Sequence, residues 1–278
     1  MMHYSLPDGS LMPMLGLGTY DLRGAEGAAS VRTAIELGYR HVDTAATYEN
    51  EEAVGEGIRS SKVARDQIFL TTKVDRANLR TSDFIGSAEA SLAALGCDYV
   101  DLLLVHWPNA EIPIEETLAG ASELVAAGKT RFIGVSNFTR PRLKALLKAS
   151  DLPLVTNQVE YHAHLNQRGL LRLCEENGVL LTAYSPLGQG SVLKDETICD
   201  IAKRIGRSPA QVALRWLLQK GVAVIPKSSS AARMRENLGM LDFELDRVEM
   251  ERIESIGVCN RVIDWWPGTF EEDPDVFA

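Results

Sequence analysis

One short stretch of the chain carries a carboxylate and a phenol five residues apart. It reads Gly-Tyr-Arg-His-Val-Asp-Thr-Ala-Ala-Thr-Tyr-Glu-Asn-Glu over residues 38–51, with Asp43 ending a predicted strand and Tyr48 in the following loop. Asn50 then begins a predicted helix, because small and apolar residues follow it at helical spacing. Polar side chains between a strand and a helix are where βα-barrels hold their catalytic groups. The structural alternative is a buried Asp that caps a turn.

Two cations end other apolar segments. Lys73 ends the run Ile-Phe-Leu-Thr-Thr-Lys at 68–73, and His106 ends Leu-Leu-Leu-Val-His at 102–106. A cation at the end of a buried strand is costly unless it is paired, so we predict that Asp43 pairs with Lys73. Further polar residues follow later strands, namely Ser136, Asn137 and Gln158. In a barrel, all of these residues would point into one mouth.

This set of side chains has the chemistry to reduce a carbonyl group. Tyrosine has a reference pKa of about 10, and we expect the Lys73 ammonium to lower the pKa of Tyr48. Tyr48 would then protonate the substrate oxygen, and His106 would donate a second hydrogen bond to it. None of these groups supplies a hydride, so the chemistry requires a redox cofactor.

The elements that must position these residues form a regular alternation of short apolar strands and amphipathic helices. Predicted strands end at about Gly18, Asp43, Lys73, His106, Ser136, Gln158, Tyr184 and Lys227. Their nearly continuous apolar runs are typical of parallel strands covered by helices. We predict a (β/α)8 TIM barrel that forms a single domain over residues 1–278, with an open doubly wound sheet as the alternative fold.

Turn and cap residues predict the elements around this barrel. His3–Leu6 and Ser10–Met12 flank Pro-Asp-Gly and form a predicted N-terminal β-hairpin that could plug one end. Helices are predicted from Thr81 or Ser82 to Gly96, over 114–127 and over 139–149. Two extra helices are predicted, one beginning at Ser208-Pro209 and one over 242–257.

Composition narrows the class of partner. The chain has 278 residues and a formal net charge of −9 with no basic run, which argues against nucleic acid or an anionic membrane. No apolar run approaches the ~18 residues of a membrane span, and the first nine residues suggest no secretion signal. The four cysteines are scattered, as is usual in a reducing cytoplasm. We expect a cytoplasmic monomer that acts on a small molecule.

Several strings together resemble the aldo-keto reductases. They are Gly-Tyr-Arg-His-Val-Asp-Thr-Ala-x-x-Tyr, Thr-Thr-Lys, Leu-Val-His-Trp-Pro, Gly-Val-Ser-Asn-Phe and Ile-Pro-Lys-Ser, spread from Leu15 to about Phe243. The sequence is most similar to the bacterial branch with the diketogluconate reductases. The resemblance implies a (β/α)8 barrel that reduces carbonyls with NAD(P)H. It also implies a catalytic tetrad of Asp43, Tyr48, Lys73 and His106.

The resemblance further implies a binding site for NADPH. Its residues would be Gly18, Thr19, Tyr20, Asp43, Ser136, Asn137, Gln158, Tyr184, Ser185, Leu187, Gly188, Lys227, Ser228, Arg233, Glu236 and Asn237. NADPH is preferred over NADH because Lys227 and Arg233 flank three serines, and residues 226–233 hold no acid that could accept a ribose hydroxyl.

A substrate pocket is predicted from Tyr20, Asp75, Trp107, Trp265 and Trp266. Asp75 stands where many members of the family have an aromatic residue, so we expect compact, polar carbonyl substrates. Glu49 stands where many members have a glycine directly after the tetrad tyrosine.

Other motifs support the rival interpretations less well. The segment Gly-Leu-Gly-Thr-Tyr-Asp at 16–21 lacks the third glycine of a dinucleotide fingerprint. His162-Ala163-His164 has the spacing of a metal-binding pair, but a structural role is favoured and no metal is predicted. The alternative functions are a cofactor-bound regulatory or scaffold barrel without catalysis, and a barrel isomerase or metal hydrolase.

Overall fold

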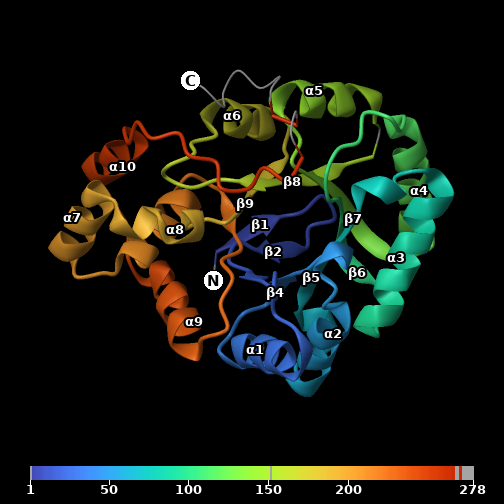
Figure 1. The fold of residues 1–278 in the computed structure, drawn as a ribbon, viewed down its shortest axis with the longest axis horizontal. Helices are drawn as coiled ribbons and strands as arrows, with labels where there is room; N and C mark the ends of the chain where they lie inside the picture. The colour runs from blue at the N-terminus through green and yellow to red at the C-terminus, as the bar shows by residue number, and fades with distance from the viewer. Residues whose placement is uncertain (1, 151, 267–268, 271–278) are drawn as a thin grey trace.

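Eight parallel strands form the centre of the molecule (Figure 1). A computed structural model describes residues 2–150, 152–266 and 269–270. In chain order the strands are β3 (Leu17–Gly18), β4 (His41–Asp43), β5 (Phe69–Val74), β6 (Val100–Val105), β7 (Thr130–Ser136), β8 (Leu154–Glu160), β9 (Leu180–Tyr184) and β10 (Ala223–Val224). Each pairs with the next along the chain, and bridges Leu15–Val224 and Gly18–Lys227 join the first strand to the last. The predicted (β/α)8 barrel is confirmed.

Helices surround the strands because one face of each is apolar and packs on the sheet (Figure 1). The helices are α1 (Gly24–Glu36), α2 (Glu51–Ser60), α3 (Thr81–Leu95), α4 (Ile114–Ala126), α5 (Arg140–Ala149), α6 (Arg168–Glu176), α7 (Glu196–Ile205), α8 (Pro209–Gln219), α9 (Ala231–Leu238) and α10 (Arg247–Glu254). Helix α3 ends at Gly96 in the left-handed conformation, as the sequence predicts. Because the helices pack on the outside of the barrel, the loops after the strands can carry the polar side chains of a site.

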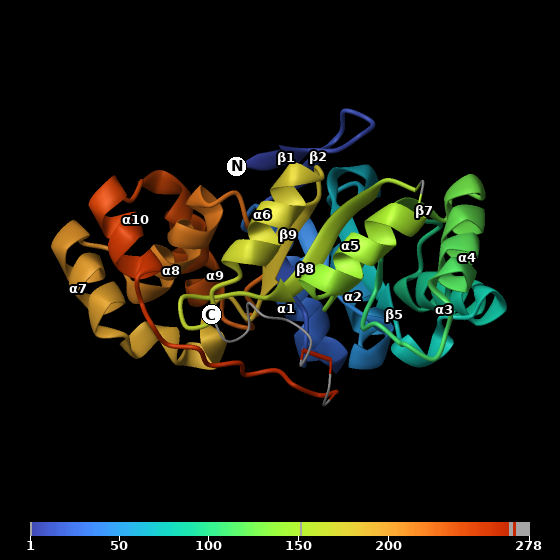
Figure 2. The ribbon, with the colours of Figure 1, turned by 90° about the horizontal axis from the view of Figure 1, so that it is seen from above.

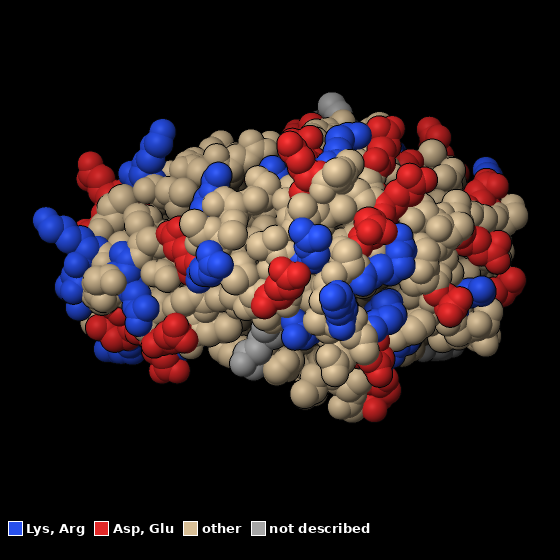
Figure 3. Space-filling model, turned by 90° about the horizontal axis from the view of Figure 1, so that it is seen from below, with Lys and Arg blue, Asp and Glu red and all other residues tan. Residues whose placement is uncertain are grey.

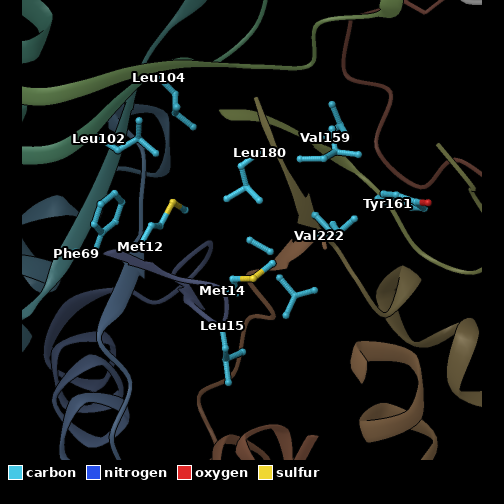
Figure 4. Packing of buried hydrophobic residues seen from close by; sticks show 14 of the residues in the cluster. Met12, Met14, Leu15, Phe69, Leu102, Leu104, Val159, Tyr161, Leu180 and Val222 are labelled. Carbon is cyan, nitrogen blue, oxygen red and sulfur yellow. The ribbon is translucent and has the colours of Figure 1, made fainter. Parts of the chain in front are cut away.

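The predicted hairpin lies at the amino-terminal end of the strands, on the opposite side from residues 260–266, which follow α10 (Figure 2). Strands β1 (His3–Ser5) and β2 (Leu11–Pro13) pair antiparallel, with His3 opposite Pro13. Met12 and Met14 belong to the same buried cluster as Phe69, Leu102 and Leu180 from three barrel strands (Figure 4). The hairpin therefore closes this end of the barrel with apolar side chains.

The helices near the end of the chain differ in part from the prediction. Helix α8 begins at Pro209 with a Ser208–Gln211 capping box, as its sequence indicates, but α7 precedes it and was not predicted separately. The last helix was predicted over 242–257 and covers a shorter range. It begins after Asp246, which forms a capping box with Glu249, because Phe243 is extended (φ −151°) and ends the preceding turn.

Charges of both signs are intermixed over the face of the molecule in Figure 3. Within the described ranges, no helix has the length and apolar character needed to cross a membrane.

Candidate active site

The polar residues at the strand ends meet around one cavity of about 560 Å³. Asp43 is the last residue of β4, and Lys73 lies in β5. His106 directly follows β6, while Tyr48 ends the short 3-10 helix Ala46–Tyr48. Asp43, Tyr48 and His106 line the cavity, and Lys73 contacts two of them from behind. Parallel strands bring these residues together because their carboxyl ends share one edge of the barrel.

Lys73 is 1% exposed and uses its three N–H groups on three different oxygens. Its Nζ donates to Asp43 Oδ1 at 2.5 Å, to the Thr44 carbonyl at 2.8 Å and to Tyr48 Oη at 3.3 Å. Burial opposes the charge, but Asp43 and Tyr48 outweigh it and raise the pKa of Lys73 above its usual value. The ammonium therefore keeps its proton and stays in contact with the phenol.

Tyr48 differs from the expectation in the direction of its pKa. Burial raises the pKa of Tyr48 and outweighs the opposing effect of Lys73, with Asp43 adding to the rise. The prediction of a lowered pKa was wrong because the sequence shows the neighbouring charge but not the loss of solvent. Tyr48 is consequently protonated at neutral pH, which is the form that a general acid needs.

His106 is buried and neutral at physiological pH. Burial and, second, the Lys73 charge hold the pKa of His106 well below its usual value. Its Nδ1 is 3.0 Å from Thr47 Oγ1, and its ring meets that of Tyr48 edge-on at 5.6 Å. A neutral imidazole has one N–H, which can be donated to an oxygen in the cavity when the other nitrogen accepts from Thr47.

The predicted nicotinamide-side residues form a connected network. Gln158 Nε2 donates to Asp43 Oδ2 at 2.7 Å, so both oxygens of this carboxylate are held. Asn137 donates to the His106 carbonyl and to Ser136 Oγ, while its own Oδ1 accepts from Tyr184 Oη at 2.8 Å. All of these residues except His106 were predicted to bind the cofactor, and all of them line the cavity.

Further loops contribute polar residues to the lining of the same cavity. The lining contains all but one of the remaining predicted cofactor residues: Gly18, Thr19, Tyr20, Ser185, Leu187, Lys227, Ser228, Arg233, Glu236 and Asn237. The exception is Gly188, which lies outside the lining although its neighbours Leu187 and Gln189 belong to it. Gly188 has φ +54°, and a Cβ there would be 2.6 Å from Ser191 Oγ. A Cβ on Gly18 would be 2.6 Å from the Ile225 carbonyl. Gly18 therefore brings backbone to the cavity where a side chain would not fit.

Aromatic rings form the opposite wall of the cavity. Tyr20, Trp107 and Trp265 line it, and the Trp265 ring lies 5.8 Å from Tyr20 and 6.4 Å from Trp107. Asp75 and Trp266 lie outside this lining, which corrects the predicted pocket. Asp75 accepts the Ala77 N–H at 2.8 Å and caps a turn, and Trp266 packs under the Arg76 guanidinium at 4.3 Å.

Some residues at or beside the cavity were missed from the sequence. Asp21 and Ile263 line it, and Thr47 contacts His106. Glu160 ends the apolar strand β8, and the rule that found Lys73 could have singled it out. Asp21 and Ile263 carry no such signal, because each lies in a loop without a recognisable pattern.

The two histidines with metal-binding spacing contact separate carboxylates. His162 Nε2 is 2.9 Å from Glu160, and His164 Nε2 is 2.9 Å from Asp195. Across the described part of the chain, no group of three or more His, Cys, Asp or Glu side chains could hold a metal ion.

Known proteins are similar to this chain over most of its length. The model of the "Aldo/keto reductase family" matches residues 14–258. Glyoxal reductase of Bacillus subtilis is 43% identical over 258 residues, which cover 92% of this chain and 93% of that protein. Methylglyoxal reductase DkgB of Escherichia coli O157:H7 is 39% identical, covering 91% and 96%.

Solved structures agree in fold as well as in sequence. The crystal structure of a putative 2,5-diketo-D-gluconic acid reductase B has a TM-score of 0.91 at 42% identity and covers 95% of each chain. The aldo-keto reductase MGS-M4 from a deep-sea metagenome library has a TM-score of 0.91 at 36% identity, covering 95% of this chain and 97% of that one. With its barrel, its strand-end residues and these relatives in agreement, this chain belongs to the aldo/keto reductase family.

Proposed function

We propose that this chain reduces small aldehydes and ketones with NADPH and that Tyr48 is the proton donor. The substrate class comprises dicarbonyls, keto acids and sugar-derived ketones. The observation that carries the proposal is the hydrogen bond from Lys73 Nζ to Tyr48 Oη. Because the phenol oxygen accepts from Lys73, its own O–H is free to point into the cavity.

The cavity lining offers groups that suit both the nicotinamide and the phosphates of a dinucleotide. Asn137, Gln158 and Tyr184 offer amide and aromatic groups for the nicotinamide. Lys227 and Arg233 are cations in the same lining and suit the phosphates. Gly18 lets backbone approach the cavity closely, as phosphate groups require. NADPH supplies the hydride when it is bound.

The side chains of this site manage the proton and the developing negative charge. Tyr48 gives its proton to the substrate oxygen, and Lys73 stabilises the phenolate that remains. Asp43 holds Lys73, and Gln158 fixes the other oxygen of Asp43. His106 orients the substrate oxygen through its ring N–H. The aromatic wall around Trp107 and Trp265 limits the access of water.

Arg233 and Lys227 favour NADPH over NADH in this proposal. Arg233 lies in the first turn of α9, whose N-cap Ser230 accepts the Arg233 backbone N–H. A guanidinium at a helix N-terminus suits a phosphate on the adenosine ribose. Glu236 is an acid that also lines the cavity, and it lies one turn after Arg233 on the same helix.

Relatives named glyoxal reductase and methylglyoxal reductase favour a dicarbonyl as the first substrate to test. The purified protein is mixed with NADPH and methylglyoxal, and absorbance of the reduced cofactor is followed with and without the carbonyl. We expect oxidation of NADPH that depends on both. If a panel of dicarbonyls, keto acids and sugar ketones gives no oxidation while NADPH still binds, the non-catalytic barrel is the better account.

A further inference from the structure

Glu160 is a completely buried carboxylate that the proposed chemistry does not use. It is the last residue of β8 and is 0% exposed. It does not line the cavity, although it pairs in register with Tyr184, which does. A buried carboxylate requires hydrogen-bond donors that offset its loss of water.

Three N–H groups supply that compensation, and two of them come from the end of the chain. Oε1 accepts from Val262 N at 2.7 Å and from His162 Nε2 at 2.9 Å. Oε2 accepts from Ile263 N at 2.8 Å. The Glu160 carboxylate thus accepts backbone N–H groups, as a neighbouring strand would, from a segment about a hundred residues away in sequence.

The segment held in this way, residues 260–266, crosses the mouth of the barrel (Figure 2). It is irregular, and Asn260 N adds a third hydrogen bond to the His164 carbonyl at 2.6 Å. Its Ile263 and Trp265 line the cavity, so the backbone bonds to Glu160 decide where these two side chains stand. Trp265 is 47% exposed, and its covered part packs near the rings of Tyr20 and Trp107.

We propose that Glu160 is a positioning residue that determines substrate specificity by holding residues 260–266 as a wall of the substrate pocket. The specificity part rests on the proposed carbonyl reduction, whereas the holding of the segment does not. An aromatic carbonyl that reaches Ile263 and Trp265 depends on the wall, and a compact dicarbonyl that stays near Tyr48 and His106 does not.

The first test measures the segment itself, without cofactor or substrate. Hydrogen exchange is followed by mass spectrometry in the peptide that spans 258–266, for wild type and Glu160→Gln. The amide of Gln keeps one acceptor oxygen and turns an NH2 group toward the other N–H, so we expect exchange at least ~tenfold faster. Unchanged exchange in this peptide would overturn the proposal, whatever the enzyme does.

Glu249→Gln is the matched control, because Glu249 is also a buried carboxylate but caps α10 away from the cavity. Both substitutions can lower the melting temperature, and only Glu160→Gln should loosen the peptide 258–266. If both loosen it equally, the role of Glu160 is general stability and the proposal fails.

The second test separates KM from kcat. For Glu160→Gln we expect KM for benzaldehyde to rise about tenfold with kcat within about twofold, and both constants for methylglyoxal to stay within about threefold. Trp265→Ala removes the wall without touching Glu160 and should reproduce the rise. Equal losses on both substrates would overturn the specificity role. A wild type without any reductase activity would refute the proposed function, while the exchange result would still stand.

Discussion

The two ends of the barrel each bury a histidine next to a threonine, but they use it differently. At the closed end, His41 has Nδ1 3.2 Å from the Pro13 carbonyl and Nε2 3.2 Å from Thr71 Oγ1. At the open end, His106 has Nδ1 3.0 Å from Thr47 Oγ1, and within the described part of the chain its Nε2 has no hydrogen-bond partner. Both rings have a lowered pKa, caused first by burial.

The difference lies in which polar groups are satisfied inside the protein. The hairpin and β5 occupy both nitrogens of His41, so neither nitrogen is left for a ligand. At the mouth, the Tyr48 O–H and one nitrogen of His106 remain for a substrate oxygen, while the charged pair behind them is fully bonded. A ligand site can therefore be recognised by free hydrogen-bonding capacity beside a rigid network.

The largest effect should come from removing the free O–H at the mouth. In Tyr48→Phe we expect carbonyl reduction to fall at least ~100-fold, because the general acid is lost, while the Kd for NADPH changes little. Steady-state kinetics with methylglyoxal and fluorescence titration with NADPH measure the two quantities. A variant with more than a tenth of wild-type turnover would show that another group donates the proton.

Removing a cation from the cavity lining should lower the affinity for the cofactor and leave the chemical step intact. We expect Arg233→Ala to raise the Kd for NADPH about ten- to a hundredfold, since a hydrogen bond to a charged group contributes roughly 1.5–3 kcal/mol. The Kd for NADH should barely change. Arg235→Ala is the control, because Arg235 is exposed on α9 and does not line the cavity. Equal affinity of the wild type for both cofactors would contradict the assignment.

How well the sequence predicts a feature depends on how close together in the chain the residues that determine it are. Strand ends, caps and the hairpin turn are local. The sequence therefore placed Lys73 and His106 within one residue of the ends of β5 and β6, and Gly96 directly after α3. Asp75 shows the limit of such reasoning: its neighbour Ala77 offers an N–H, and this cap keeps the carboxylate out of the pocket.

Features that depend on long-range contacts were not predictable in the same way. The Val262 and Ile263 N–H groups that meet Glu160 are 102 and 103 residues away from it. The pKa of Tyr48 depends on whether burial or Lys73 has the larger effect, and a sequence gives no measure of burial. The motif strings nevertheless predicted the family, because they combine local pattern with order along the whole chain.

The closed end should reveal itself through the pH dependence of stability. The pKa of His41 is lowered, so the folded protein keeps the ring neutral while the unfolded chain takes up a proton below about pH 6.5. Its contribution to stability is present above that pH and is lost as the pH falls, by up to about 2 kcal/mol at pH 5.

Urea unfolding at pH 7.5 and pH 5 measures this contribution. The difference in unfolding free energy between wild type and His41→Gln should shrink at the lower pH, by no more than that amount. A difference for His41→Gln that stays constant between the two pH values would mean that the ring takes up a proton in the folded state as readily as in the unfolded chain.

The smallest effect should come from the threonine that distinguishes the open-end histidine. Thr47 can donate to His106 Nδ1, and this leaves the ring N–H on Nε2 for the substrate oxygen. In Thr47→Val the buried Nδ1 loses its partner and the tautomer with Nδ1–H is no longer disfavoured. The loss of one neutral hydrogen bond, about 1 kcal/mol, predicts a roughly fivefold rise in KM for methylglyoxal.

Thr47→Ser keeps the hydroxyl and should stay within about twofold of wild type, because the ring responds to the donor at Nδ1 and not to the bulk of the side chain. Nitrogen chemical shifts of His106 report the tautomer directly, and an unchanged tautomer together with an unchanged KM in Thr47→Val would show that the two histidines do not differ through their threonines.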